Sequence, residues 1–265
     1  MEENKKFRIV SSKKTRYLLP NILTIAGVCL GISSIKFSID GNFSLAVTLI
    51  LFASILDALD GRIARLIKGT SEFGKELDSL TDFVSFGIAP VFILYFWELN
   101  TYGKFGWAIA LVYSVCCVLR LARFNLTKID NHQEWKNNFF EGVPSPAGGI
   151  LVLMPLIYSF SEIQLIAFDY DILVPSFFLL ISILLISKIP TYSLKKIVVK
   201  RSTTIFLLFS VILFFGLLLI FTFNTILISS LIYLLIIPIS SMHYLSYKKK
   251  FSTQFDDSDD HEDIL

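Results

Sequence analysis

Charge is scarce in this sequence: only 17% of its 265 residues are Asp, Glu, Lys or Arg, whereas 54% are hydrophobic and the mean hydropathy is +0.66. A soluble domain of this length needs a more polar surface. The short alternating segments typical of a transmembrane barrel are also missing, and long apolar runs take their place. Because lipid leaves backbone polar groups to be satisfied within the chain, these runs predict membrane-spanning helices.

Cysteine and histidine are equally rare. The three cysteines, Cys29, Cys116 and Cys117, lie inside apolar runs without zinc spacing, and we interpret them as small buried side chains. The three histidines show no paired ligand spacing either. No polar connection is long enough to fold as a soluble domain, and nothing indicates a nucleic-acid partner.

The sequence predicts an all-α integral membrane protein with about eight transmembrane helices. The spans are expected near 18–39, 43–61, 73–97, 104–126, 146–165, 170–188, 203–222 and 224–244. Residues 1–17 are basic and predict an interfacial helix, not a cleavable signal peptide. We therefore expect four units: this segment, a six-helix core over 18–188, two further helices over 189–247, and a charged tail over 248–265.

Basic residues alternate from one connection to the next. They cluster in the N-terminal arm and near residues 62–75, 120–136, 188–201 and 248–250, whereas the other connections contain only Lys104. Positively charged connections face the cytoplasm. The pattern predicts that both termini, and the connection after the second span, lie on the cytoplasmic side of the inner membrane.

That connection and the helix ends beside it contain the stretch "DALDGRIARLIKGTSEFGKELDSLTD", with aspartates at 57, 60, 78 and 82. At about 100° per residue, Asp57 and Asp60 share one helical face, and Asp78 and Asp82 share a face of the next helix. Two antiparallel helices can turn these faces toward each other. The sequence therefore predicts a pocket of four carboxylates at one membrane boundary.

Four adjacent carboxylates need cations to stay ionised. Oxygen ligands suit hard divalent ions, so Mg²⁺ or Mn²⁺ is expected, with Ca²⁺ also able to bind, and two ions can share four carboxylates in phosphoryl displacement. Two other interpretations remain. Asp57 or Asp60 alone can be a solvated helix end, and a cation transporter also places acids within spans. A transport path would continue through the midplane, where we find no second cluster.

Small residues accompany the acids. Gly61 and Ala64 lie on the face of Asp57 and Asp60, with Arg65 at its edge, and Gly74 precedes Asp78 by four residues. Small side chains leave room for a bulky ligand, or let helices pack closely. For Gly61 we favour ligand room, and for Gly74 both interpretations stay open.

The whole stretch matches the pattern D-x2-D-G-x2-A-R-x8-G-x3-D-x3-D, and so resembles the CDP-alcohol phosphatidyltransferases. The matching positions are Asp57, Asp60, Gly61, Ala64, Arg65, Gly74, Asp78 and Asp82. The segments "LPNILTIAGV", "ELDSLTDFVSFGIAP", "LRLARFN" and "FFEGVPSPAGG" are similar to the phosphatidylserine synthase branch of that family. The resemblance is close over roughly residues 18–150, and beyond them only hydropathy is alike.

The resemblance implies a reaction in which CDP-diacylglycerol donates its phosphatidyl group to the hydroxyl of L-serine and CMP is released. It implies that the four aspartates hold two divalent ions, that Asp82 is also the general base, and that Gly61, Ala64 and Arg65 border the CDP group. It further suggests a homodimer among membrane lipids. A sibling enzyme that uses glycerol 3-phosphate or inositol remains the main alternative, and the acceptor pocket separates the two.

Other polar residues near this end of the spans have two interpretations each. Arg120 and Arg123 can snorkel to the interface, or form an anion pocket with Asn125 for the serine carboxylate or the donor phosphate. Ser85 can join that pocket, or hydrogen-bond within its own helix.

The first span opens with two further candidates. Asn21 and Thr24 can contact the nucleotide, or belong to a helix start that Pro20 sets.

Overall fold

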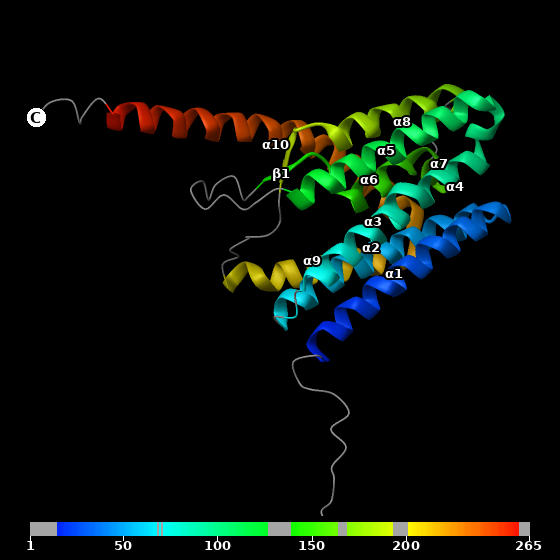
Figure 1. Ribbon diagram of the computed structural model, residues 1–265, viewed down its shortest axis with the longest axis horizontal. Helices are drawn as coiled ribbons and strands as arrows, with labels where there is room; N and C mark the ends of the chain where they lie inside the picture. The colour runs from blue at the N-terminus through cyan, green and yellow to red at the C-terminus, as the bar shows by residue number, and fades with distance from the viewer. Residues whose placement is uncertain are drawn as a thin grey trace, which may run out of the picture.

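The computed structural model describes residues 15–67, 69, 71–126, 139–163, 169–192 and 201–259 (Figure 1). The predicted interfacial segment lies, over residues 1–14, outside the described residues, as do the last residues of the charged tail. The elements are α1 (Thr15–Ile39), α2 (Phe43–Leu66), α3 (Glu72–Asp82), the π-helix η1 (Phe83–Ile88), α4 (Ala89–Trp97), the 3₁₀ turn η2 (Leu99–Tyr102), α5 (Lys104–Leu126), β1 (Phe139–Glu141), α6 (Ser145–Val152), α7 (Met154–Phe160), α8 (Tyr170–Ile186), β2 (Pro190–Tyr192), α9 (Arg201–Ile220) and α10 (Thr222–Asp259).

The predicted all-α membrane fold is confirmed. Among the described residues, 5 segments are long and apolar enough to cross a membrane: Leu18–Ile39, Phe43–Leu66, Glu72–Trp97, Lys104–Leu126 and Thr222–Tyr247. Two shorter apolar helices, Tyr170–Ile186 and Ile205–Ile220, fall where two more spans are expected. The number eight stays a prediction.

The prediction of one continuous helix over 146–165 is wrong. The chain forms two short helices there, α6 and α7, with a break at Leu153. Pro155 lies in the first turn of α7, and its ring lacks the N–H that a continuous helix would use. Two other helices run on further than predicted, since α2 ends at Leu66 and α10 at Asp259.

The N-terminal half of the bundle places the acidic stretch. α1 and α2 form an antiparallel hairpin, which turns at Gly41 with φ of 78° and starts α2 on the Asn42 cap. α3, η1 and α4 then run back as the third span, and α1 packs against each of them. α5 and α8 pack together on the other side of the bundle, with α6 between them and α2 (Figure 1).

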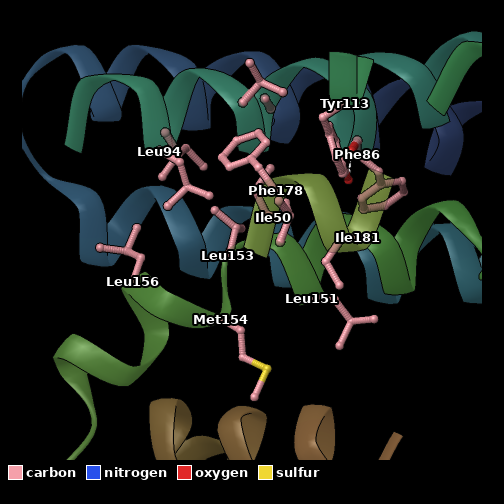
Figure 2. Packing of buried hydrophobic residues seen from close by; sticks show 14 of the residues in the cluster. Ile50, Phe86, Leu94, Tyr113, Leu151, Leu153, Met154, Leu156, Phe178 and Ile181 are labelled. Carbon is pink, nitrogen blue, oxygen red and sulfur yellow. Dashed lines mark hydrogen bonds between the residues drawn. The ribbon is translucent and has the colours of Figure 1, made fainter. Parts of the chain in front are cut away.

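The core forms where these helices meet. Ile50 of α2, Phe86 of η1, Tyr113 of α5 and Phe178 of α8 are all fully buried (Figure 2). The Tyr113 hydroxyl donates a 3.0 Å hydrogen bond to the Phe86 carbonyl, which ties α5 to the π-helix. Met154 of α7 points toward α10 (Figure 2), so the core continues to the C-terminal helices.

A small antiparallel pair of strands, which the sequence did not predict, joins the loop before α6 to the end of α8. Phe139 pairs with Tyr192, Phe140 with Thr191 and Glu141 with Pro190. Gly142 follows with φ of 78°, and its N–H donates to the Ile189 carbonyl at 2.9 Å. A Cβ atom at Gly142 would lie 2.7 Å from the Ser187 carbonyl oxygen, so only glycine fits this close approach.

The C-terminal helices differ in how they are covered. α9 packs mainly against α10, and most of its described side chains are exposed in the isolated chain, as expected for a helix facing lipid. α10 contacts α7, α9 and β2, and then extends well beyond the bundle (Figure 1).

Candidate functional site

The ends of α2 and α3 bring three of the four aspartates together. Asp57, Asp60 and Asp78 each offer a carboxylate oxygen, and these oxygens lie within 4.8 Å of one another. Asp60 is buried with 4% of its surface exposed, whereas Asp57 and Asp78 are half-buried. Helical periodicity accounts for the convergence, because the two pairs lie on facing sides of antiparallel helices.

Thr24 of α1 holds one of these carboxylates in place. Its Oγ1 donates to Asp60 Oδ2 at 2.6 Å and lies 3.0 Å from the Pro20 carbonyl. Thr24 itself is buried, with 5% of its surface exposed. The Thr24 hydroxyl thus bonds a carboxylate of the cluster, and the predicted contact of Thr24 with a nucleotide stays a prediction.

Asp82 lies one turn further along α3, outside that group of three. It lies within electrostatic range of Asp57, Asp78 and Arg120. Its Oδ1 atom is buried and has no hydrogen-bond partner among the described residues. A buried carboxylate oxygen is costly without a partner, so this atom is available to a proton or a ligand.

The donor set fits a divalent cation. The three clustered side chains supply only carboxylate oxygens, the ligands that Mg²⁺, Mn²⁺ and Ca²⁺ prefer. The orphaned Oδ1 of Asp82 adds negative potential beside them. Asp57, Asp60 and Asp78 are thus the residues that can hold such an ion, and a role for Asp82 as a fourth ligand stays a prediction.

A π-helix begins directly after Asp82, and nothing in the sequence signals it. Such segments are rare and occur often at functional sites. Ser85, within this π-helix, is fully buried and donates to the Gly27 carbonyl of α1 at 3.2 Å. A Cβ atom at Gly31 would lie 2.6 Å from Ser85 Oγ, so α1 packs directly on the π-helix. The Ser85 hydroxyl thus binds α1 and not its own helix, and its predicted place in the substrate pocket stays a prediction.

The two glycines beside the acids have different surroundings, one open and one closely packed. A Cβ atom at Gly61 would meet nothing within 4 Å, so space is open beside the acids. A Cβ atom at Gly74 would lie 3.1 Å from Asn21 Oδ1 and 3.1 Å from Ser71 Oγ, so Gly74 permits close packing of α1 on α3. Asn21 is thereby placed at the start of α3, where Ser71 Oγ accepts from the Gly74 N–H at 3.0 Å.

Two further predicted residues lie in the last turn of α2. Ala64 is half-buried and Arg65 is exposed, and both follow Gly61 toward the end of the helix. The structure records no contact that tests their predicted role beside a CDP group.

Arg120 is a buried basic residue near the acids. Only 8% of its surface is exposed, and Nη1 donates to Ser145 Oγ at the start of α6. Its guanidinium lies 5.6 Å from the centre of the Phe124 ring and within electrostatic range of Asp82. A buried guanidinium beside a carboxylate cluster can bind an anion that bridges the two.

Arg123 and Asn125 have other partners. Arg123 donates to the carbonyls of Ile186 at 2.7 Å and Ser187 at 3.2 Å, and so caps the C-terminal end of α8. Asn125 Nδ2 donates to Ser79 Oγ at 2.9 Å and ties α5 to α3. Arg123 and Asn125 thus each bond to a neighbouring helix, and their predicted place with Arg120 in an anion pocket stays a prediction.

The sequence reasoning missed two residues near Arg120. Ser145 lies in the segment "FFEGVPSPAGG". The family resemblance of this segment does not assign a role to the Ser145 hydroxyl. Tyr233 of α10 lies within electrostatic range of Arg120, and it belongs to an apolar run without any motif. No local signal could have placed a tyrosine of the last helix beside an arginine of α5.

Substitution of Thr24 by valine is expected to weaken Mn²⁺ binding by about 10–100-fold, because a side chain that orients a metal ligand contributes that much. The measurement is calorimetric titration of the purified chain with Mn²⁺. Thr48→Val is the matched control, since Thr48 makes a similar bond to its own helix, to the Ser44 carbonyl at 2.8 Å, without a carboxylate. Equal effects of the two variants would contradict the role of Thr24.

Comparisons with known proteins place the acids within a known family. A family model described as CDP-alcohol phosphatidyltransferase matches residues 17–187, which include every acid of the cluster. A protein of Helicobacter pylori (strain 26695), named CDP-diacylglycerol–serine O-phosphatidyltransferase, is 35% identical over 192 residues, or 72% of this chain and 78% of that protein.

Two further relatives carry the same name. The Mycobacterium leprae protein is 44% identical over 137 residues, which are 51% of this chain and 45% of that protein. The Bacillus subtilis protein is 36% identical over 142 residues, or 53% of this chain and 77% of that protein. The match to the mycobacterial relatives thus spans about half of their length.

Proposed function

Because the chain belongs to the CDP-alcohol phosphatidyltransferase family, we propose that it transfers the phosphatidyl group of CDP-diacylglycerol to L-serine, giving phosphatidylserine and CMP. The observation that carries the proposal is the convergence of Asp57, Asp60 and Asp78, with Asp82 and Arg120 beside them. The names of the relatives support serine as the acceptor.

The residues divide the reaction between them. A divalent cation bound by Asp57, Asp60 and Asp78 would neutralise charge on the donor diphosphate. Asp82 takes the proton of the serine hydroxyl. The serine oxygen forms a bond to the phosphorus next to the lipid, and the bond from that phosphorus to the CMP oxygen breaks. Arg120 stabilises negative charge on the transferred phosphoryl group. The open space beside Gly61 admits the nucleotide.

A cation transporter is the rival from another class. Acids that serve transport would be expected along a path through the bilayer. Within the described residues, one group of three or more possible metal ligands is found, and it lies in a single helical hairpin. This confinement favours a reaction at one membrane face over transport.

The acceptor is tested with purified chain in mixed micelles, CDP-diacylglycerol and Mg²⁺ or Mn²⁺. Addition of L-serine is expected to release CMP at least 100-fold faster than addition of glycerol 3-phosphate or inositol, because a site built for polar groups rejects analogues strongly. Release with glycerol 3-phosphate alone would overturn serine as acceptor and keep the family reaction. Release without any ion gradient excludes transport as the main role.

We further propose on which side of the membrane the site lies, how the chain is divided into units, and that it forms a homodimer. The alternation of basic connections supports a cytoplasmic location for the acids and both termini. Residues 18–188 would be the catalytic core, 189–247 an added helix pair, and the active form a homodimer in the membrane.

A further inference from the structure

We propose that a cavity beneath the acids receives an acyl chain of the lipid donor, and that the C-terminal helices α9 and α10 set which chains fit. The proposal rests on the proposed function. The cavity has a volume of about 240 Å³ and lies between α2, α6, α9 and α10. Its lining is mostly apolar: Leu51, Ser54, Ile55, Ala147, Ile150, Leu151, Phe214, Leu218, Ile226, Ser229, Ser230 and Tyr233.

The cavity continues the candidate site along α2. Ser54 precedes Asp57 by three residues and Leu51 precedes it by six, so the wall begins roughly 4.5 Å below the acid and reaches roughly 9 Å below it. A lipid whose diphosphate lies at Asp57, Asp60 and Asp78 has its tails on this side of its head group. The cavity is therefore where a tail would enter the protein.

Tyr233 connects the cavity with the polar site. Its side chain lines the cavity, and its buried hydroxyl has no hydrogen-bond partner among the described residues. The nearby Thr191 hydroxyl donates to the Gly142 carbonyl at 2.8 Å, and its oxygen receives no hydrogen bond from Tyr233. A buried donor between a head-group site and an apolar cavity matches the ester carbonyl of a diacylglycerol, which lies between head and tail.

The wall formed by α9 and α10 lies outside the part of the chain that matches the family. That match ends at residue 187, whereas Phe214, Leu218 and Tyr233 come later. The chemistry thus belongs to the shared core, and the fit of the acyl chain belongs to the added helix pair. This gives α9, which is otherwise exposed to lipid, a function at the site.

Leu218→Trp tests the cavity, and Leu219→Trp is its matched control. Leu218 lines the cavity, while its neighbour Leu219 is 76% exposed on the outer face of α9. CMP release is measured with full-length chain in mixed micelles, using donors with two octanoyl or two palmitoyl chains. Leu218→Trp should raise KM for the palmitoyl donor about tenfold, because each methylene kept out of an apolar site costs about fourfold in affinity. The octanoyl donor and Leu219→Trp should show wild-type KM.

Tyr233→Phe tests the ester contact, with the exposed Tyr247→Phe of the same helix as control. KM for the diester donor should rise about fivefold at unchanged kcat, as expected for one lost neutral hydrogen bond. A donor with ether-linked chains has no carbonyl, so Tyr233→Phe should leave its KM unchanged. A merely structural role of the hydroxyl would affect both donors alike.

The outcomes separate this inference from the proposed function. If the wild-type chain releases no CMP from any donor with any acceptor, the proposed function fails. If it does, and Leu218→Trp has the same chain-length profile as Leu219→Trp, the acyl-chain cavity is overturned. A folded variant should melt at a higher temperature when CDP is added. If CDP does not raise the melting temperature of Leu218→Trp, that variant is misfolded and Phe214→Ala is used in its place. That variant enlarges the cavity and should lower KM for chains longer than palmitoyl; an unchanged profile would likewise overturn the inference.

Discussion

Replacement of Asp82 by asparagine is expected to lower the rate of CMP release by about 10²–10⁴-fold, the usual contribution of a general base. Asparagine keeps the size of the side chain and cannot take the serine proton. Since Asp82 lies outside the group formed by Asp57, Asp60 and Asp78, binding of Mn²⁺ and CDP should change little. Turnover is followed by CMP release, and binding by calorimetric titration of the same preparation.

The control for this variant is Asp40→Asn. Asp40 is an exposed acid at the far end of α1–α2, paired with Lys36 in its own helical turn at 2.5 Å. Its loss should leave turnover and binding unchanged. Wild-type turnover in Asp82→Asn would show that another group takes the proton. A loss of Mn²⁺ binding in that variant would show instead that Asp82 is a fourth ligand.

Replacement of Asp57 by asparagine is expected to remove both binding and turnover. Asp57 interacts with each of the other three acids, Asp60, Asp78 and Asp82. A metal ion stabilises transition-state charge by several kcal/mol, and its loss corresponds to a fall in kcat/KM of about 10³-fold or more. The concentration of Mn²⁺ that gives half-maximal CMP release should rise at least tenfold.

Metal removal provides the matching measurement on the unmodified chain. EDTA should stop CMP release, and added Mg²⁺ or Mn²⁺ should restore it. The two variants should differ in their response to Mn²⁺. Extra Mn²⁺ should raise the rate of CMP release by Asp57→Asn, whereas it should leave the rate of Asp82→Asn unchanged. Identical Mn²⁺ dependence in both would contradict the division of roles between ligand and base.

The acids could be predicted because one local property decides their position. A helix turns about 100° per residue, so the spacing of Asp57 and Asp60 places both on one face of α2, and the spacing of Asp78 and Asp82 places both on one face of α3. The turn between α2 and α3 is short, so the two faces must meet. Hydropathy places the longest spans for a similar reason, since each apolar run has to match the thickness of the bilayer.

The arginines show where such reasoning stops. Arg120 and Arg123 are three residues apart on one helix, yet Arg120 donates to Ser145 and lies within electrostatic range of Asp82, while Arg123 caps α8. Spacing places both on the same side of α5, but the partners come from α3, α6 and α8. Which helix lies against which arginine follows from how the bundle packs.

The sequence by itself determined the membrane class, the acidic faces and the resemblance to a phosphatidyltransferase family, because hydropathy, helical period and motif are local properties. Only the tertiary structure decided that Thr24 donates a hydrogen bond to Asp60, that Ser85 donates one to α1, and that Tyr233 lines the cavity within electrostatic range of Arg120. These contacts join residues far apart in the chain. Their formation depends on the rotation and depth of each helix, which interlocking side chains set in the folded bundle.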